Sequence, residues 1–379
     1  MAFIQHPPAS GSSVGWLVVI DRTGAKRFQS RGWADLWGIA WRPDARELWF
    51  TAAEPREYKS LRATTLDGRE RTVARMLGQT DLQDISRDGR VLVSRPDFRV
   101  ELMARAPGAS RERSLTWLGQ SIVNDLSSNG GRVLFSESSL SSDYGEFVYL
   151  RPTDGSPAVR LGDGQGLALS PDGKWVVALT SDSSRLMVMP TGPGAVNDLT
   201  RRGFSYAVRV LGILVSWASW LPDSRHVIFN AVANDGPTRL FVQGFEGDPR
   251  PVGPPGLLGQ VISPDGRAIV AAPAGGPAMV YPLDGGNPVA CKGLEKDEVA
   301  IQWSADGRSL LCRRTVGLTA EVTSVDLATG RRTFLWRLAA ADPAGASAPE
   351  RVVVTPDGRS YAYSVFRDTG DLYVIEGLR

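Results

Sequence analysis

Short apolar runs alternate with turn residues along the whole chain. In one copy of the pattern, LALS precedes the phrase Ser170-Pro171-Asp172-Gly173 and WVVAL follows it closely. The runs are four to six residues long and rich in Val, Ile, Leu and Trp. This is typical of β-strands, because an amphipathic helix needs a longer stretch with a 3.6-residue period. The pattern therefore predicts strands throughout.

The turn phrase recurs at intervals of 41 to 51 residues, and its eight copies are centred on Asp44, Asp88, Asn129, Asp172, Asp223, Asp265, Asp306 and Asp357. Pro and Asp suit the central positions of a β-turn, and the following Gly accepts left-handed backbone geometry. A second Gly-containing turn, such as Asp154-Gly155, follows within each repeat. Each repeat is therefore expected to contain four strands.

Four strands per period, repeated radially, indicate an all-β fold of the β-propeller type. We expect a single propeller domain over residues 1–379 with eight four-stranded antiparallel blades, closed by pairing N-terminal with C-terminal strands. The pattern yields two strands more than eight blades require, so seven blades or an incomplete ninth remain alternatives. The surplus also predicts that the chain is the C-terminal part of a longer protein.

The phrase W/L-S-P-D-G-R/K followed by four apolar residues resembles the repeat of TolB-like propellers, which are related to WD-repeat proteins. The resemblance covers essentially the whole chain. Longer stretches, such as GIAWRPDARELWFTA and the ending VTPDGRSYAYSVFRDTGDLYVIEGLR, are similar to propellers fused C-terminally to bacterial, notably acidobacterial, serine/threonine protein kinases. The resemblance implies a signalling module that binds or senses a protein, a peptide or a small polar ligand.

Charge and hydropathy indicate which classes of binding partner the chain can have. The chain has 43 basic and 41 acidic residues and no basic block, so we expect no nucleic-acid partner. The longest apolar run, VLGILVSWASWL, has twelve residues, whereas a membrane-spanning helix needs about twenty. We expect a soluble chain without membrane insertion. Its compartment stays open: extracytoplasmic if an upstream transmembrane kinase tethers it, otherwise cytoplasmic.

The chain contains few of the residues and motifs that commonly perform catalysis or bind metals. The chain lacks the glycine-rich, HRD and DFG motifs of kinases, and it has only two histidines, His6 and His226, and two cysteines, Cys291 and Cys312. The recurrent aspartates are read as turn formers. We therefore predict no catalytic site, no cofactor and no metal, and hence no enzyme. The alternative is an accessory propeller of a hydrolase or peptidase, or a metal-assisted hydrolase with a site in its channel.

Long irregular connections are expected on the face opposite the repeated turns, and such loops commonly carry binding sites. We place a ligand-binding site at the channel mouth on that face. It would be formed by residues that enter the inner strands, namely Trp37, Asp84, Asp125, Gln165, Trp217, Gln260 and Glu298. Tryptophans within strands, including Trp220 and Trp303, are expected to pack between blades.

Overall fold

The computed structural model describes residues 1–7, 13–55, 57–75, 78–138, 145–210 and 213–378. In these ranges the chain forms strands and turns and contains no helix, which confirms the all-β prediction. Accordingly, the described residues include no helix with the length and apolar character needed to cross a membrane.

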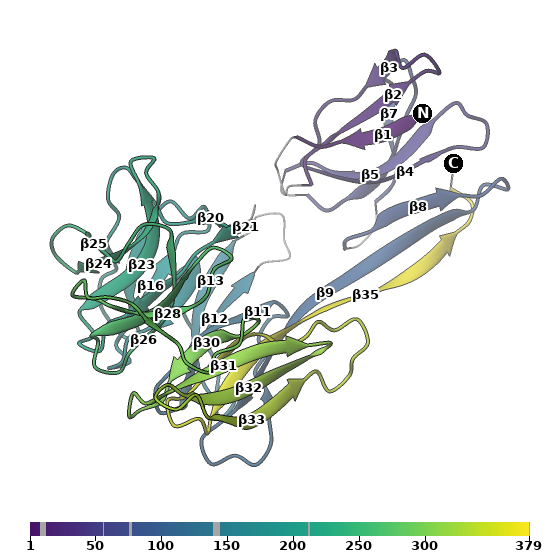
Figure 1. The fold of residues 1–379 in the computed structure, drawn as a ribbon. Coiled ribbons are helices and arrows are strands. Elements are labelled where there is room, and N and C mark those ends of the chain that lie inside the picture. The colour runs from purple at the N-terminus through teal and green to yellow at the C-terminus, as the bar shows by residue number, and fades with distance from the viewer. Residues whose placement is uncertain (8–12, 56, 76–77, 139–144, 211–212, 379) are drawn as a thin grey trace. The chain divides into compact units, whose positions relative to one another are not determined.

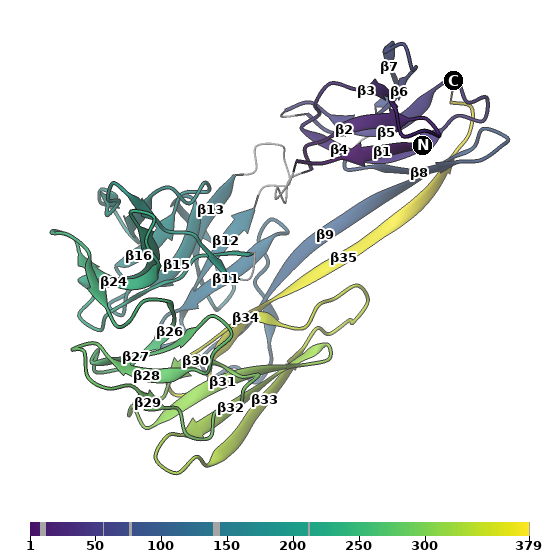
Figure 2. The same ribbon diagram turned by 45° about the horizontal axis from the view of Figure 1, so that its top comes forward.

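The chain divides into two compact units. Unit 1 takes its described residues from 1–98 and 368–378, and unit 2 from 99–138 and 145–367. Two long strands, β9 (Val91–Arg105) and β35 (Tyr361–Ile375), contribute residues to both units. They are neighbours in one sheet and run side by side in Figures 1 and 2.

Unit 1 contains three sheets. The first is β1 (Ala2–Gln5), β2 (Trp16–Ile20) and β3 (Lys26–Gln29), and the second is β4 (Asp35–Trp41), β5 (Leu48–Ala53), β6 (Ser60–Thr64) and β7 (Glu70–Arg75). The third joins β8 (Asp81–Ile85) to the unit 1 parts of β9 and β35. Buried apolar side chains fill the spaces between consecutive sheets, as where Leu17 meets Phe50 and where Trp49 meets Val93.

The described residues of unit 2 form six antiparallel sheets of four or five strands, which we call blades 1 to 6, and one two-stranded sheet. Blade 1 is β11 (Ser121–Leu126), β12 (Arg132–Ser138), β13 (Glu146–Pro152) and β14 (Val159–Asp163); blade 2 is β15 (Gln165–Leu169), β16 (Trp175–Leu179), β17 (Leu186–Pro190) and β18 (Asn197–Asp198). Blade 3 is β22 (Ala218–Trp220), β23 (His226–Ala233), β24 (Thr238–Gly244) and β25 (Arg250–Val252), with β19 (Phe204–Ser205) also on β23. A separate hairpin joins β20 (Val208–Val210) to β21 (Ile213–Val215).

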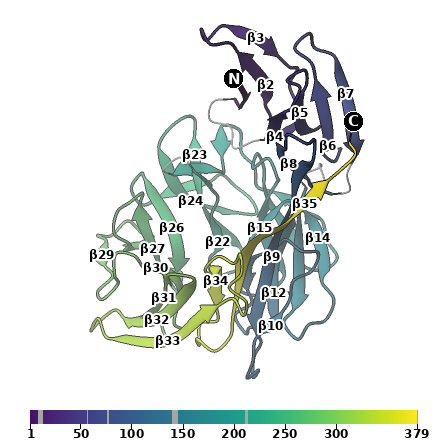
Figure 3. The same cartoon turned by 90° about the vertical axis from the view of Figure 1, so that its right-hand side faces the viewer.

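Blade 4 is β26 (Leu257–Ile262), β27 (Ala268–Pro273), β28 (Met279–Pro282) and β29 (Val289–Ala290). Blade 5 is β30 (Val299–Trp303), β31 (Ser309–Val316), β32 (Thr319–Asp326) and β33 (Arg332–Ala339). Blade 6 combines late and early segments in the order β34 (Glu350–Val354), β35, β9 and β10 (Arg113–Ser114). Figure 3 shows blades 3, 4 and 5 following one another around unit 2.

The six blades close into a ring. A separate cluster of buried apolar side chains lies between every pair of neighbours, including blades 6 and 1, where Leu102 and Ala362 meet Val123 and Phe135. Each innermost strand is also hydrogen-bonded, through a backbone or side-chain atom, to a neighbouring blade, and every pair of neighbouring blades has at least one such bond. Unit 2 is therefore a six-bladed propeller, an architecture that leaves only short, protected strand edges.

The repeated turns have the geometry that the sequence predicts. Gly173 has a φ of 70°, its N–H donates to the Ser170 carbonyl at 2.8 Å, and the Asp172 carboxylate accepts bonds from the Ser170 hydroxyl and the Lys174 N–H. Ala45 and Ser224 replace this glycine in two copies and still adopt left-handed φ values of 55° and 54°. The side-chain bonds of the aspartate hold the turn even where the glycine is missing.

A count of eight blades in one ring is not confirmed. The repeats centred on Asp44 and Asp88 begin sheets of unit 1, and the remaining six repeats supply the innermost strands of unit 2. The late strands β34 and β35 complete a blade with β9 and β10 rather than with the first strands of the chain. The turn phrase specifies a hairpin, and it carries no information about which of the two units that hairpin joins.

Candidate functional site

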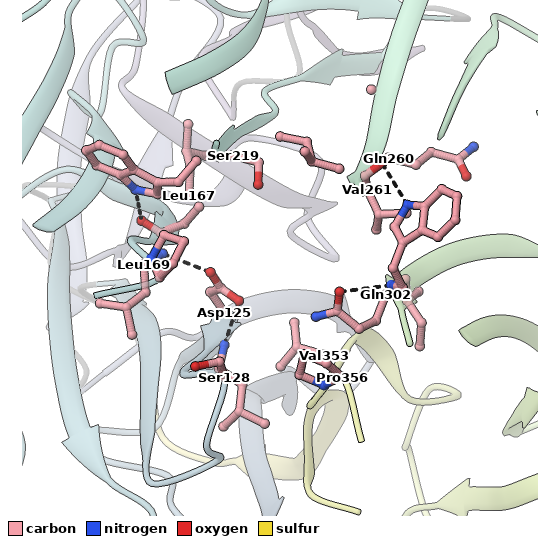
Figure 4. Close-up of a pocket in the computed structure, with 18 of the residues that line it drawn as sticks. Asp125, Ser128, Leu167, Leu169, Ser219, Gln260, Val261, Gln302, Val353 and Pro356 are labelled. Carbon is pink, nitrogen blue, oxygen red and sulfur yellow. Dashed lines mark hydrogen bonds between the residues drawn. The ribbon is translucent and has the colours of Figure 1, made fainter. Parts of the chain in front are cut away.

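A cavity of about 700 Å³ lies at the centre of unit 2, lined by residues from the innermost strands of all six blades (Figure 4). It reaches the repeated turns, where the residue after the first turn position lines it in every blade; these residues are Ser128, Pro171, Pro222, Pro264, Ala305 and Pro356. The sequence-based prediction placed the binding site on the opposite face, at the long connections. That placement assumed that tight turns fill their end of the channel, whereas here they border the cavity.

One position of the repeat supplies the middle of the cavity wall. Two residues before each turn, blades 1 to 6 carry Asp125, Ala168, Ser219, Val261, Gln302 and Val353, and all six line the cavity. Polar side chains therefore stand on blades 1, 3 and 5 and alternate with apolar ones on blades 2, 4 and 6. Figure 4 shows Asp125, Ser219 and Gln302 around the same cavity.

Asp125 is the one carboxylate among the described residues that line the cavity. One of its oxygens accepts the N–H of Leu126 at 2.7 Å, and the other accepts the N–H of Leu169 in blade 2 at 2.8 Å. The surrounding channel walls remove water from the carboxylate, and this desolvation raises the pKa of Asp125 to about 6 despite both hydrogen bonds. Asp125 is therefore an acceptor that gains a proton just below neutral pH.

Other polar atoms of the wall have hydrogen-bonding capacity left. Gln302 donates its Nε2 to the Val354 carbonyl at 3.2 Å, and its Oε1 accepts the Trp303 N–H at 2.9 Å, which leaves one lone pair on Oε1. The Nδ2 of Asn124 is buried and has no partner among the described residues. The cavity wall thus offers acceptors from three blades and a spare donor next to Asp125.

The structure brings together three of the seven residues that the sequence singled out. Asp125, Trp217 and Gln260 line the cavity. The Nε1 of Trp217 donates to the Gln260 carbonyl at 3.2 Å, and the Gln260 Oε1 accepts the N–H of Ala300 at 3.1 Å, so both side chains also join neighbouring blades. Whether the group binds a ligand stays a prediction.

The other four lie elsewhere. Gln165 opens β15 and Glu298 is buried outside the cavity lining, where its carboxylate pairs with Arg332 at 2.6 Å. Trp37 and Asp84 belong to unit 1. Trp37 is 46% exposed, and Asp84 accepts the N–H of Ile85 at 2.8 Å, just as Asp125 accepts that of Leu126.

Sequence reasoning missed Ser219, Gln302 and Asn124, and it missed Arg351, the one basic residue among the described residues of the lining. It chose residues near the start of each inner strand. Alignment of the eight turn copies would have identified Ser219 and Gln302, because both occupy the repeat position of Asp125, two residues before the turn. Asn124 and Arg351 carry no comparable signal in the sequence.

The tryptophans next to the turns do pack between blades, as predicted. Trp220 and Trp303 are 4% and 5% exposed. The indole N–H of Trp220 donates to the Ala168 carbonyl of blade 2, and that of Trp303 donates to the Val261 carbonyl of blade 4.

The residues most often found in metal sites do not cluster in the described parts of the chain. Cys291 and Cys312 are buried free thiols, and desolvation raises the pKa of Cys291 to about 11. Among the described residues, no three His, Cys, Asp or Glu side chains lie close enough to hold a metal ion.

Comparison with known proteins finds solved structures whose fold is similar to that of this chain. No protein-family model and no curated protein matches the chain. Similar solved structures include an oligogalacturonate lyase from Vibrio parahaemolyticus, at 13% identity and a TM-score of 0.45 over 69% of this chain and 77% of the lyase. They also include TolB from Acinetobacter baumannii, at 12% identity and a TM-score of 0.29 over 98% of this chain and 64% of TolB.

A puromycin-hydrolyzing peptidase from Mycobacterium tuberculosis is similar at 17% identity and a TM-score of 0.43, over 86% of this chain and 57% of the peptidase. The chain thus spans less than two thirds of the length of TolB and of the peptidase. At these identities the likeness concerns the fold alone, and it does not bear on fusion to a kinase.

The prediction that the chain is not an enzyme needs correction. It was based on missing motifs, yet the similar structures include an oligogalacturonate lyase and a puromycin-hydrolyzing peptidase. The solved structures that resemble this chain thus include enzymes, and the absence of kinase or hydrolase motifs from the sequence does not exclude catalysis.

Proposed function

We propose that unit 2 is a ligand-binding propeller whose central cavity takes a small molecule with a primary ammonium group. The observation that carries this proposal is the alternation of Asp125, Ser219 and Gln302 around the cavity wall. A primary ammonium has three N–H donors, and the three blades supply a carboxylate, a hydroxyl and an amide oxygen as acceptors. Charge-assisted hydrogen bonds of this kind are stronger than neutral ones.

The raised pKa of Asp125 supports a cationic ligand. Taking a carboxylate out of water is unfavourable unless a partner compensates its charge. Among the described residues, Asp125 has two backbone N–H groups and no cationic group as hydrogen-bond partners. An ammonium bound beside it would offset the desolvation that now raises its pKa, so ligand binding and ionisation of Asp125 reinforce each other.

Calorimetry with n-butylamine and n-butanol tests the proposal, because the two probes differ only in the charged group. We expect the amine to bind at least about tenfold more tightly, since a hydrogen bond to a charged group contributes about 1.5–3 kcal/mol. Asp125→Asn should abolish this preference. Asp84→Asn is the matched control, because Asp84 occupies the same repeat position in unit 1. Equal binding of both probes, or equal loss in both variants, would contradict the proposal.

A second candidate is proton-transfer catalysis on the bound molecule. It is favoured by the pKa of Asp125 of about 6, because a carboxyl group that titrates near neutral pH can act as a general acid or base. Under this candidate the propeller would admit the substrate of a hydrolase or lyase. Turnover of a substrate panel that disappears in Asp125→Asn and survives in Asp84→Asn would establish it. The signalling role implied by kinase-fused propellers stays a prediction.

A further inference from the structure

A second cavity, of about 500 Å³, lies in unit 2 between the outer strand of blade 5 and the two hairpin turns of blade 6. Its lining includes Arg105 at the end of β9, Trp336 on β33 and Arg359 in the turn between β34 and β35. The segment 108–110 completes it. None of these residues contributes to the central cavity.

The charged residues in the described lining of this second cavity are both basic. Two arginines and no carboxylate contribute to its described lining. The acidic residue of the adjoining loop, Glu112, is already engaged, because its two oxygens accept the hydroxyls of Tyr361 at 2.8 Å and Tyr363 at 2.7 Å. Asp357 accepts the N–H of Arg359 and the hydroxyl of Thr355 within its own turn, and its carboxylate also interacts electrostatically with the Arg359 side chain.

The guanidinium groups are presented in different ways. The Nε of Arg105 donates to the Ala109 carbonyl at 3.0 Å, and the Arg105 side chain also hydrogen-bonds to Tyr361. These bonds fix the side chain and leave the other N–H groups of the guanidinium, which has five in all, as donors. Arg359 is exposed. Guanidinium groups recognise carboxylate and phosphate oxygens through paired N–H donors, so the two arginines together form an anion-binding arrangement.

An aromatic wall accompanies this charge. Trp336 is half-buried and packs against the ring of Tyr361, with centroids 4.9 Å apart and planes inclined by 49°. The indole therefore has a fixed position at the edge of the cavity. Planar ligand groups gain contact area from such a wall, and aromatic pairs contribute beyond the area that they bury.

From this juxtaposition we propose that the second cavity binds a small aromatic anion. Its phosphate or carboxylate group is held by Arg105 and Arg359, and its ring lies against Trp336. A planar carboxylate and a tetrahedral phosphate each present a pair of oxygens that the two parallel N–H donors of a guanidinium can bind. The site is independent of the amine site in the central cavity.

Titration calorimetry on the 379-residue chain distinguishes the contributions. Phenyl phosphate and benzoate should bind, whereas benzyl alcohol lacks the charge and methyl phosphate lacks the ring, so both should bind at least about tenfold more weakly. Tighter binding of phenyl phosphate than of benzoate, or the reverse, identifies the preferred head group. Wild-type protein that binds neither aromatic anion at millimolar concentration, or methyl phosphate that matches phenyl phosphate, overturns the proposal.

Matched variants locate the site. Arg359→Gln should weaken phenyl phosphate binding at least about tenfold, whereas Arg267→Gln and Arg308→Gln, exposed arginines at the same turn position in blades 4 and 5, should leave it unchanged. Trp336→Leu should weaken phenyl phosphate and leave methyl phosphate unaffected. Arg359 is exposed, so its variant should fold even if Arg105→Gln does not. Equal effects of Arg359→Gln and Arg267→Gln would show non-specific attraction and overturn the proposal.

Discussion

The backbone N–H of Val123 donates a 2.8 Å hydrogen bond to the hydroxyl of Ser364, 241 residues further along the chain. The same hydroxyl reaches the Ser121 carbonyl at 3.3 Å. Ser364 is fully buried on β35, so these bonds attach blade 6 to the innermost strand of blade 1 and complete the ring. The chain also runs directly from β10 of blade 6 into β11 of blade 1, so the ring is closed by the pairing of the late strand β35 with the early strand β9 inside blade 6. The bonds of Ser364 hold the seam between this composite blade and blade 1.

Removal of the seam hydroxyl should therefore destabilise unit 2. In Ser364→Ala the buried N–H of Val123 loses its acceptor, and an unsatisfied buried donor costs about 1–3 kcal/mol. The free energy of unfolding, measured by chemical denaturation, should fall by that amount. Thr333→Ala, at an exposed position of β33, is the control and should change stability by less than about 0.5 kcal/mol. An unchanged free energy in Ser364→Ala would mean that the apolar contacts alone hold the seam.

Loss of an inter-blade indole bond should also cost stability. Trp303→Phe removes the hydrogen bond from Nε1 to the Val261 carbonyl, at 3.4 Å, and leaves a space between blades 4 and 5. We expect a loss of about 1–3 kcal/mol in the free energy of unfolding. Trp37→Phe, at a 46% exposed position in unit 1, should have a small effect. Equal effects of the two substitutions would show that the burial of Trp303 and its bond to blade 4 add no stability beyond that of an exposed tryptophan.

Local features of this fold follow from the sequence. Pro, Asp and Gly in the turn phrase specify a hairpin through φ preferences and side-chain bonds within four or five residues, so the strands and turns could be predicted. The packing role of Trp303 follows from its size and its place in a strand. These properties depend on neighbours in sequence, and one chain contains enough copies to identify them.

Ring membership depends on contacts between distant segments. β9 lies before blade 1 and still completes blade 6 with β35, and nothing in either strand's composition indicates this pairing. The candidate site was recovered in part for the same reason. Asp125 and Gln260 were predicted as residues entering the inner strands, whereas Arg351 lines the cavity from β34, whose sheet is completed by the distant strand β9.

The repeated turns should make stability sensitive to acid. The hydroxyl of Ser304, followed by the N–H of Arg308, lowers the pKa of Asp306 below its usual value. A carboxyl whose folded pKa is lowered stabilises the fold above its unfolded pKa of about 3.9, and this contribution is lost as pH falls through the folded pKa. Asp306→Ala should lower the melting temperature at pH 7, and its difference from wild type should shrink towards pH 3.

The substitution Asp306→Asn distinguishes the contribution of the hydrogen-bond acceptor at this turn position from the contribution of the negative charge. Asn129 occupies this turn position in blade 1, and its Oδ1 accepts the Ser127 hydroxyl at 2.8 Å and the Gly131 N–H at 3.0 Å. An asparagine therefore satisfies the turn without titrating. Asp306→Asn should keep most of the stability of wild type at pH 7 and should lose less of it on acidification. A variant as unstable as Asp306→Ala would show that the charge, rather than the turn bonds, matters.

Asp125 should give stability the opposite dependence on pH. Its folded pKa of about 6 lies above the unfolded value of about 3.9, so the folded state binds the proton more tightly. The stability that this provides is complete below pH 3.9 and is lost as pH rises through 6, by up to about 3 kcal/mol. Asp125→Asn cannot titrate, so the stability of the variant relative to wild type should rise between pH 4 and 7.

The test is how the stability difference between Asp125→Asn and wild type changes with pH, and not the size of that difference at any one pH. Asparagine retains one acceptor oxygen but presents an N–H donor to the Leu169 N–H, and this penalty is independent of pH. Amine binding supplies a second readout, because ionised Asp125 increases about tenfold in fraction between pH 5 and 7 for a pKa of about 6. The affinity of n-butylamine should rise by about that factor. Parallel stability curves of wild type and variant, with pH-independent amine affinity, would show that Asp125 is ionised throughout and does not respond to the cavity.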